Sequence, residues 1–180
     1  DSVAMQGIVQ ELDIQTGEVL FEWRSIDHVA LEETYVTPSE DHYPGIDYFH
    51  LNSIEVDHDS NLLVSARATF AVYKIDRKSG AILWRLGGKK SDFEMGPGTR
   101  FAFQHDARRL ADGTISIFDN GTTVFHGKVP EAVEEARGIV VGLDERTVVV
   151  EGDRIVAVTD EAGTSHCRPS GCGSTNRSWR

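Results

Sequence analysis

An internal repeat constrains the fold of this chain more than any other feature. The segment from Gly7 to Asp13 (GIVQELD) recurs as Phe70–Asp76 (FAVYKID) and as Gly138–Asp144 (GIVVGLD). The first two copies are followed by a glycine turn and a second apolar run that contains a tryptophan, whereas this continuation fails after the third. Each complete copy therefore predicts two strands joined by an Asp/Gly turn.

A second, weaker repeat lies between these copies. Residues 50–67 (HLNSIEVDHDSNLLVSAR) resemble residues 105–120 (HDARRLADGTISIFDN). The offset is 53 residues both from Asp59 to Asp112 and from Arg67 to Asn120. Each stretch predicts a β-hairpin with an aspartate-rich turn.

Together the two repeats define a unit of four antiparallel strands, which is typical of the blades of a β-propeller. The 180 residues hold about three such units, whereas a closed ring takes about 4–8 blades. We therefore expect an all-β partial propeller over residues 1–163, either as part of a longer ring or closed by association of chains. Residues 164–180 are rich in arginine and lack acidic residues, which predicts a disordered or non-native tail.

The charge of the chain excludes several classes of partner. The net charge is -11, so the chain lacks the basic surface needed to bind nucleic acid or an anionic membrane. No apolar run approaches the roughly 18 residues of a membrane span. The opening residues, DSVAMQG, do not have the pattern of a signal peptide, and we expect that preceding residues were removed or are not included.

Asp57, Asp59 and Asn61 have the spacing that opens a calcium loop. The glycine at the sixth position and the closing glutamate of such a loop are absent. We interpret this motif as a hairpin turn and predict neither a metal site nor a cofactor.

Two histidines are the main candidates for chemistry. His50 and His105 each lie near the start of the first strand of a predicted blade, the strand that lines the central channel of a propeller. We expect them to converge at one channel mouth from repeat-equivalent positions. Arg67 ends the hairpin partner of His50, and Asn52 lies on the same face of the strand as His50. The alternative, ordinary polar residues at strand starts, stays open.

Aromatic residues flank both histidines. Tyr48 and Phe49 precede His50, and Phe103 lies just before His105. These side chains are candidates for an apolar shelf under an aromatic substrate, with packing in the core as the alternative.

At these residues the sequence resembles the arylsulfotransferase family. The resemblance is carried by YFHLNS from Tyr48, LVSAR ending at Arg67, ILWRLGG from Ile82 and FQHD from Phe103. It implies a six-bladed propeller, often exported, and hence an extracellular or periplasmic location. The implied reaction transfers a sulfuryl group from a phenolic sulfate ester to a phenol, through a sulfated histidine and without a nucleotide donor.

The resemblance also implies roles for individual residues. His105 matches the nucleophile that is transiently sulfated, and His50 and Arg67 match residues that hold the sulfuryl oxygens and assist proton transfer. Asn52 matches a further residue of the motif. Arginine suits this task because its planar guanidinium is always charged and presents several donors.

Two other functions remain open at this stage. The chain could be a propeller that binds or scaffolds without turnover. The pattern D-x-x-[TS]-G-x-x-L-[FW] also resembles the repeats of quinoprotein propellers, which require a calcium site.

Overall fold

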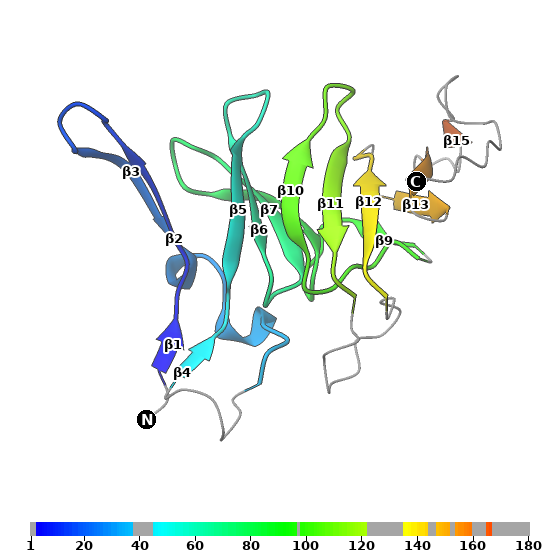
Figure 1. Cartoon of the computed structure of the whole chain (residues 1–180), viewed down its shortest axis with the longest axis horizontal. Helices are drawn as coiled ribbons and strands as arrows, with labels where there is room; N and C mark the ends of the chain where they lie inside the picture. Colours follow the sequence, from blue (N-terminus) through cyan, green and yellow to red (C-terminus); the bar gives the residue numbers. More distant parts are fainter. Residues whose placement is uncertain are drawn as a thin grey trace.

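The described part of the chain consists mainly of β-strands joined by turns, which confirms the all-β prediction (Figure 1). Two short 3-10 helices, η1 (Ser25–Asp27) and η2 (Leu31–Glu33), are the helical elements in the described part. No helix among these residues is long and apolar enough to cross a membrane. The computed structural model describes residues 3–37, 45–96, 98–121 and 135–143 in full, and the backbone of 147–151, 154–159 and 165–166.

The central sheet is the predicted four-stranded antiparallel unit. Its strands are paired in chain order: β5 (Leu51–Val56), β6 (Leu62–Ala66), β7 (Ala71–Ile75) and β8 (Ile82–Gly87). Every residue of β6 and β7 is buried, because both faces of this sheet are covered. These two strands accordingly read as nearly continuous apolar runs rather than as an alternating pattern.

A second sheet follows the same plan but has three strands. Its order is β10 (His105–Arg109), β11 (Ile115–Asp119) and β12 (Arg137–Val141), all antiparallel. β12 lies within the third copy of the repeat, in the place that β7 has in the central sheet. No fourth strand is added to this sheet in the described part of the chain.

The strands after residue 143 depart from the predicted antiparallel blades. β13 (Thr147–Glu151) pairs with β14 (Arg154–Thr159) in antiparallel fashion but with the short β9 (Glu94–Met95) in parallel. β15 (Ser165–His166) pairs with the other edge of β14. The prediction of purely antiparallel blades is therefore wrong here, because the glycine turn and tryptophan strand of the earlier copies are missing from the sequence.

The N-terminal region contributes one hairpin and one parallel pair. β2 (Ile8–Leu12) and β3 (Val19–Arg24) form the hairpin expected for the first copy of the repeat. β1 (Val3–Met5) pairs in parallel with β4 (Gly45–Asp47), a strand about 40 residues further along the chain. This pair brings β4 directly before the start of β5.

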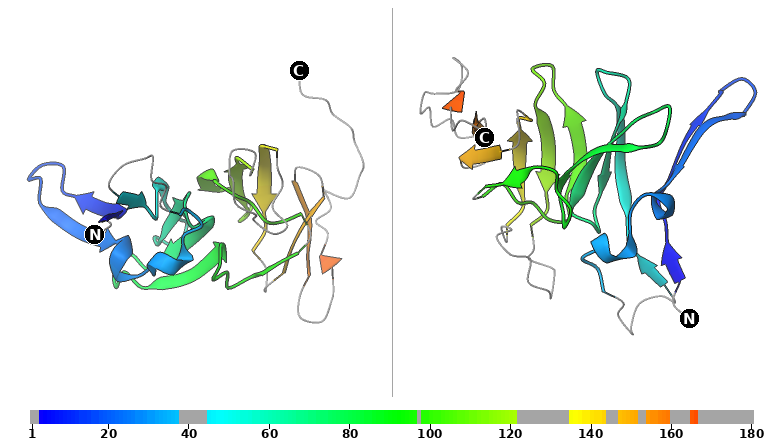
Figure 2. Two further views of the ribbon diagram at one scale, coloured as in Figure 1. Left: turned by 90° about the horizontal axis from the view of Figure 1, so that it is seen from below. Right: turned by 180° about the vertical axis from the view of Figure 1, so that it is seen from behind.

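The central sheet separates two clusters of apolar side chains. Val64 and Tyr73 face a cluster that includes Trp23 from the β2–β3 hairpin. Leu63 and Val72 face the opposite way, into a cluster shared with the β10–β12 sheet. The sheets follow one another in chain order, as the two views in Figure 2 show. The side chains of the two clusters pack between them.

The aspartates of the first repeat work as turn residues. The carboxylate of Asp13 accepts hydrogen bonds from the backbone N–H groups of Gln15 and Thr16, and Asp76 does the same with Lys78 and Ser79. Such bonds from a side chain to its own backbone stabilise tight turns. The pattern that resembled a quinoprotein repeat is thus accounted for by turn chemistry.

Side chains connect β5 directly to β10. The hydroxyl of Ser53 accepts a hydrogen bond from the backbone N–H of Ala107, with 3.1 Å between the two atoms. The amide of Asn52 donates to the carbonyl of Gln104 at 2.8 Å. These bonds hold the first strands of two successive sheets side by side.

A buried ion cluster joins the same two strands at their far ends. The side chain of Asp57, only 3% exposed, contacts the ammonium of Lys74 and is 2.8 Å from the guanidinium of Arg109. The carboxylate of Asp59 also contacts Lys74, and it accepts the backbone N–H of Asn61 in the turn. The D-x-D-x-N motif is therefore a hairpin turn, as predicted, with its first carboxylate engaged by two cations.

The sheets of the described part do not close on themselves, so the propeller and its number of blades stay predictions. The predicted tail, residues 164–180, lies outside the described residues except for β15. The domain division at residue 163 likewise stays a prediction.

Candidate active site

His50 and His105 meet where the central sheet adjoins the β10–β12 sheet. His50 directly precedes β5, and His105 is the first residue of β10. Their ring centroids are 6.4 Å apart, and the ring planes cross at 76°. Both side chains are partly buried, so the two imidazoles form one cluster that solvent can reach.

The backbone register corrects one detail of the predicted repeat. His50 and Phe103 are offset by 53 residues, and each adopts a left-handed conformation with φ of 51°. The pairs at the far ends of the hairpins have the same offset, namely Val56–Leu62 and Arg109–Ile115. His50 is therefore equivalent to Phe103, and Asn52 to His105. The prediction that the two histidines occupy equivalent positions is wrong, although their rings converge.

Asp47 orients the imidazole of His50. One carboxylate oxygen accepts the backbone N–H of His50 at 3.0 Å, and the other lies 2.5 Å from Nδ1 of the ring. A carboxylate on Nδ1 fixes the tautomer of a histidine and leaves Nε2 for chemistry. Asp47 belongs to β4, so the parallel β1–β4 pair has a direct connection to the site.

His105 is held through the same ring nitrogen. Its Nδ1 lies 2.9 Å from the carbonyl oxygen of Phe103 and 2.7 Å from the amide nitrogen of Asn120. That amide also donates to the Phe103 carbonyl at 2.5 Å. No hydrogen bond to Nε2 is formed by the residues that the structure describes.

Gln104 fixes the start of β10 on the central sheet. Its side chain is fully buried, and its amide nitrogen lies 3.0 Å from each of the carbonyl oxygens of Ala66 and Ala71. Buried polar groups need such partners, so Gln104 has one well-defined position. Because it directly precedes His105, it anchors the backbone that carries this imidazole.

The guanidinium of Arg67 lies over an aromatic ring rather than against a carboxylate. Its central carbon is 4.5 Å from the centroid of the Phe103 ring, a cation–π contact. Burial lowers the pKa of Arg67, and the charge of nearby Asp47 opposes this effect. Within the described residues no hydrogen bond or ion pair engages its N–H groups, which are therefore available for an anion.

The aromatic residues predicted to bind substrate lie in two different environments. Tyr48 and Phe49 are 1% and 0% exposed and belong to the core cluster beside the β2–β3 hairpin. Burial raises the pKa of Tyr48, whose hydroxyl donates to Ser25 at 2.8 Å. Phe103 instead lies directly beneath Arg67 and next to His105. Contact between any of these rings and a substrate stays a prediction.

Asn52 connects the cluster to the neighbouring strand. Its amide nitrogen donates to the carbonyl of Gln104, while its Oδ1 is buried and has no hydrogen-bond partner among the described residues. An unpaired buried oxygen is costly, and it suits a site where a ligand or water supplies the missing donor. Among the described side chains, no group of three or more His, Cys, Asp or Glu is arranged to hold a metal ion.

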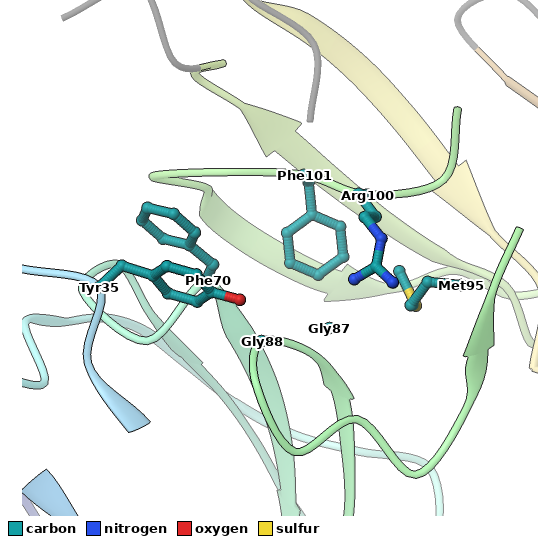
Figure 3. A pocket seen from close by; sticks show the side chains of 7 residues that line it. All are labelled: Tyr35, Phe70, Gly87, Gly88, Met95, Arg100 and Phe101. Carbon is teal, nitrogen blue, oxygen red and sulfur yellow. The ribbon is translucent and has the colours of Figure 1, made fainter. Parts of the chain in front are cut away.

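A small hollow is lined largely by aromatic side chains (Figure 3). Its volume is about 240 Å³, including open solvent, and its lining residues are Tyr35, Phe70, Gly87, Gly88, Met95, Arg100 and Phe101. Phe70 stacks on Tyr35 with centroids 4.2 Å apart and meets the edge of Phe103 at 4.7 Å. One continuous row of rings thus connects this hollow to Arg67.

The glycine pair of the WRLGG motif shapes one wall of this hollow. Gly87 has φ of 79° and Gly88 φ of 72°, conformations that other residues adopt only with strain. A Cβ on Gly87 would lie 2.7 Å from both the Phe101 ring and the Phe70 carbonyl. Glycine is therefore required here for the close approach of the end of β8 to Phe101 and to the Phe70 carbonyl.

A family model described as arylsulfotransferase (ASST) matches residues 1–167. The chain belongs to the arylsulfotransferase family. No curated protein matches the chain. The family match extends well beyond the motifs that carried the sequence resemblance, and it includes the strands β13, β14 and β15.

Two residues of this arylsulfotransferase cluster were missed by the sequence reasoning. Asp47 lies three residues before His50, a spacing that on an irregular segment gives no clear signal. Asn120 had a usable signal, since it has the same offset of 53 from Arg67 as Asp112 has from Asp59. Because Arg67 was singled out, its repeat-equivalent could have been singled out too.

Proposed function

We propose that this arylsulfotransferase transfers a sulfuryl group between phenols through a covalent intermediate on His105. The observation that carries the proposal is the convergence of two imidazoles and an arginine that has no carboxylate partner among the described residues. His50 and His105 have ring centroids 6.4 Å apart, and the Arg67 guanidinium lies over Phe103, the residue whose carbonyl contacts His105. Membership of the family supports a transferase.

In the first step, the lone pair of His105 Nε2 forms a bond to sulfur while the bond from sulfur to the aryl oxygen breaks. The departing oxygen keeps the electron pair and receives a proton from His50, whose ring is steadied by Asp47. Nε2 suits this role because the described contacts of the ring all fall on Nδ1.

In the second step, an acceptor phenol gives its proton to His50 and its oxygen attacks sulfur. The bond from nitrogen to sulfur breaks and returns the lone pair to Nε2. Arg67 contributes in both steps, because negative charge on the sulfuryl oxygens needs fixed donors in a partly dehydrated site. The row of rings from Phe103 to Tyr35 provides apolar surface for the aryl groups.

The kinetic test is a two-substrate assay with an aryl sulfate donor and a phenol acceptor. A covalent intermediate predicts ping-pong kinetics, in which double-reciprocal plots at different acceptor concentrations are parallel. Intersecting plots would show direct transfer between bound substrates and contradict the intermediate. A folded chain that binds the aryl sulfate but releases no phenol would instead be a binding module. Extracellular or periplasmic location and association into oligomers remain proposals derived from the family and the fold.

A further inference from the structure

Asn120 has a direct contact with His105 that neither the family match nor the sequence motifs assign. Its amide nitrogen is 2.7 Å from His105 Nδ1 and 2.5 Å from the carbonyl oxygen of Phe103. A carbonyl oxygen has two lone pairs, so it can accept the Asn120 amide and the Nδ1–H of His105 together. With the proton on Nδ1 both nitrogens are donors, so the 2.7 Å approach of the amide to Nδ1 is then a contact and not a hydrogen bond. The three groups therefore form a compact arrangement on one side of the imidazole.

The Phe103 carbonyl belongs to a residue whose backbone conformation requires stabilising contacts. Phe103 is in the left-handed region with φ of 51°, a conformation that non-glycine residues adopt only where surrounding contacts stabilise it. This conformation turns its carbonyl toward the imidazole ring. The equivalent residue of the preceding hairpin, His50, has the same φ, and its carbonyl accepts the backbone N–H of Arg67 at 2.9 Å. In both hairpins, the carbonyl of the residue with positive φ thus accepts a hydrogen bond from the residue that follows the second strand.

The backbone beneath Asn120 is fixed by a buried carboxylate. Asp119 is 0% exposed, and one of its oxygens accepts the backbone N–H groups of Ala102 and Gly121, each at 2.9 Å. Its other oxygen is 3.0 Å from the guanidinium of Arg137 on β12. Ala102, which precedes Phe103, and Gly121, which follows Asn120, are therefore bound to the same carboxylate. The amide of Asn120 is consequently presented to the Phe103 carbonyl by a rigid frame.

We propose that Asn120 is a positioning residue that determines which ring nitrogen of His105 reacts. By holding the Phe103 carbonyl against Nδ1, it keeps the proton on Nδ1 and leaves the lone pair of Nε2 available. The inference rests on the proposed role of His105 as the nucleophile, but the contact itself can be tested without turnover.

The first test uses the imidazole as its own reporter. Two-bond ¹H–¹⁵N correlation spectra of the full chain, recorded with neutral histidine rings, identify the nitrogen that carries the proton, and His105→Gln assigns the signal. We expect the wild-type chain to have the His105 proton on Nδ1. Asn120→Leu, which removes both amide contacts at similar volume, should shift the ring toward the other tautomer. Asn120→Asp should keep the proton on Nδ1, because a carboxylate at this place accepts it directly.

A matched control is available in the equivalent sheet. Asn61→Leu changes an asparagine in the β5–β6 turn, where its contacts are to Asp59 and Arg77. It should leave the His105 signals unchanged. An unchanged His105 tautomer in Asn120→Leu would overturn the proposal, as would a wild-type ring with its proton on Nε2.

The second test measures the reaction. Hydrogen-bond partners that orient functional histidines typically contribute about 10- to 100-fold, and Asn120→Leu should lower kcat by about that factor with little change in KM. An unchanged kcat in Asn120→Leu would also overturn the proposal. If the wild-type chain transfers no sulfuryl group at all, the proposed function fails, and the tautomer measurement still decides whether Asn120 positions the ring.

Discussion

The β5–β6 and β10–β11 hairpins have the same backbone register but contribute different chemistry to the candidate site. Three pairs of equivalent positions border the cluster: His50 with Phe103, Asn52 with His105, and Arg67 with Asn120. In the first hairpin the left-handed residue is a histidine, whereas in the second it is Phe103, which contributes its carbonyl and the ring beneath Arg67. The comparison shows that the scaffold determines where groups are placed, while the residue type at each place determines the role.

The two hairpins also differ in how their histidines are supported. His50 receives a carboxylate from Asp47, which belongs to a strand outside the repeat. His105 is supported from within its own hairpin by Phe103 and Asn120. A supporting residue within the repeat, such as Asn120, can be inferred from sequence spacing. A supporting residue outside the repeat, such as Asp47, can be identified only from the structure.

The largest effect is expected where the two hairpins are tied together. Asp57→Ala should lower the free energy of unfolding by about 3–5 kcal/mol, because it leaves Lys74 and Arg109 buried without their shared partner. Urea denaturation followed by circular dichroism measures this change. Asp59→Ala removes a carboxylate that is 55% exposed and should cost at most about 1 kcal/mol. Equal losses for both variants would contradict the view that Asp57 joins the hairpins.

The same carboxylate gives the stability a predictable dependence on pH. Burial alone would raise the pKa of Asp57, but the hydrogen bonds from Arg109 and Lys74 outweigh it and hold the pKa well below the ordinary value of 3.8. The stabilisation is therefore complete above the unfolded pKa and decreases as the pH falls below about 4. Denaturation midpoints measured across this range should fall more steeply for the wild type than for Asp57→Asn. Equal slopes would show that folding does not lower the pKa of Asp57.

The next largest effect is expected at Arg67, whose equivalent in the second hairpin is the uncharged Asn120. Arg67→Ala should lower the rate of sulfuryl transfer by about 10²–10³-fold, or about 3–4 kcal/mol, because one charged donor to the sulfuryl oxygens is lost. Steady-state kinetics with an aryl sulfate and a phenol measure this change. Arg67→Lys keeps the charge but not the planar set of donors, so its rate should lie between those of the wild type and Arg67→Ala. Unchanged turnover in Arg67→Ala would remove this residue from the site.

A smaller effect is expected from the support of His50. Asp47→Asn keeps the shape of the side chain but removes the negative charge beside Nδ1, and it should lower kcat by about 10- to 100-fold. Asp106→Asn provides the control, since Asp106 is exposed and pairs with Arg108 at the surface. Similar losses in both variants would show that general surface charge, rather than orientation of His50, is responsible.

The smallest effect concerns the ring beneath Arg67. Phe103→Leu keeps an apolar side chain but removes the cation–π contact, which is worth about 0.5–2 kcal/mol. The KM for the aryl sulfate should rise by roughly 2- to 30-fold while the fold is kept. Leu86→Met, in the core cluster away from the histidines, is a matched control that should leave KM unchanged. A KM unaffected by Phe103→Leu would show that the ring does not position Arg67.

Much of the fold could be predicted from the sequence because the repeat determines local pairing. The hairpins β2–β3, β5–β6, β7–β8 and β10–β11 all follow from apolar runs that flank aspartate or glycine turns. The parallel pairs β1–β4 and β9–β13 could not be predicted, because they are formed by strands of two to five residues that are far apart in the chain. Short strands have too little periodicity to be recognised, and their pairing depends on tertiary packing.

The candidate site was predicted in part for the same reason. His50, His105 and Arg67 lie in repeated or family-like motifs, and the structure brings them together. The histidine equivalence failed because the two histidines are 55 residues apart, whereas the strand pairing of the two hairpins repeats with an offset of 53. The sequence alone allowed either alignment of the two hairpins, and the observed strand pairing decides between them.

The intact mass of the chain after incubation with an aryl sulfate and no acceptor tests the central claim most directly. Circular dichroism should accompany it to establish that wild type and variants are folded. The account predicts a gain of one SO₃ group in the wild type, its absence in His105→Ala, and its loss when a phenol is added. A folded wild-type chain that gains no mass, or a gain that persists in His105→Ala, would contradict a sulfated His105.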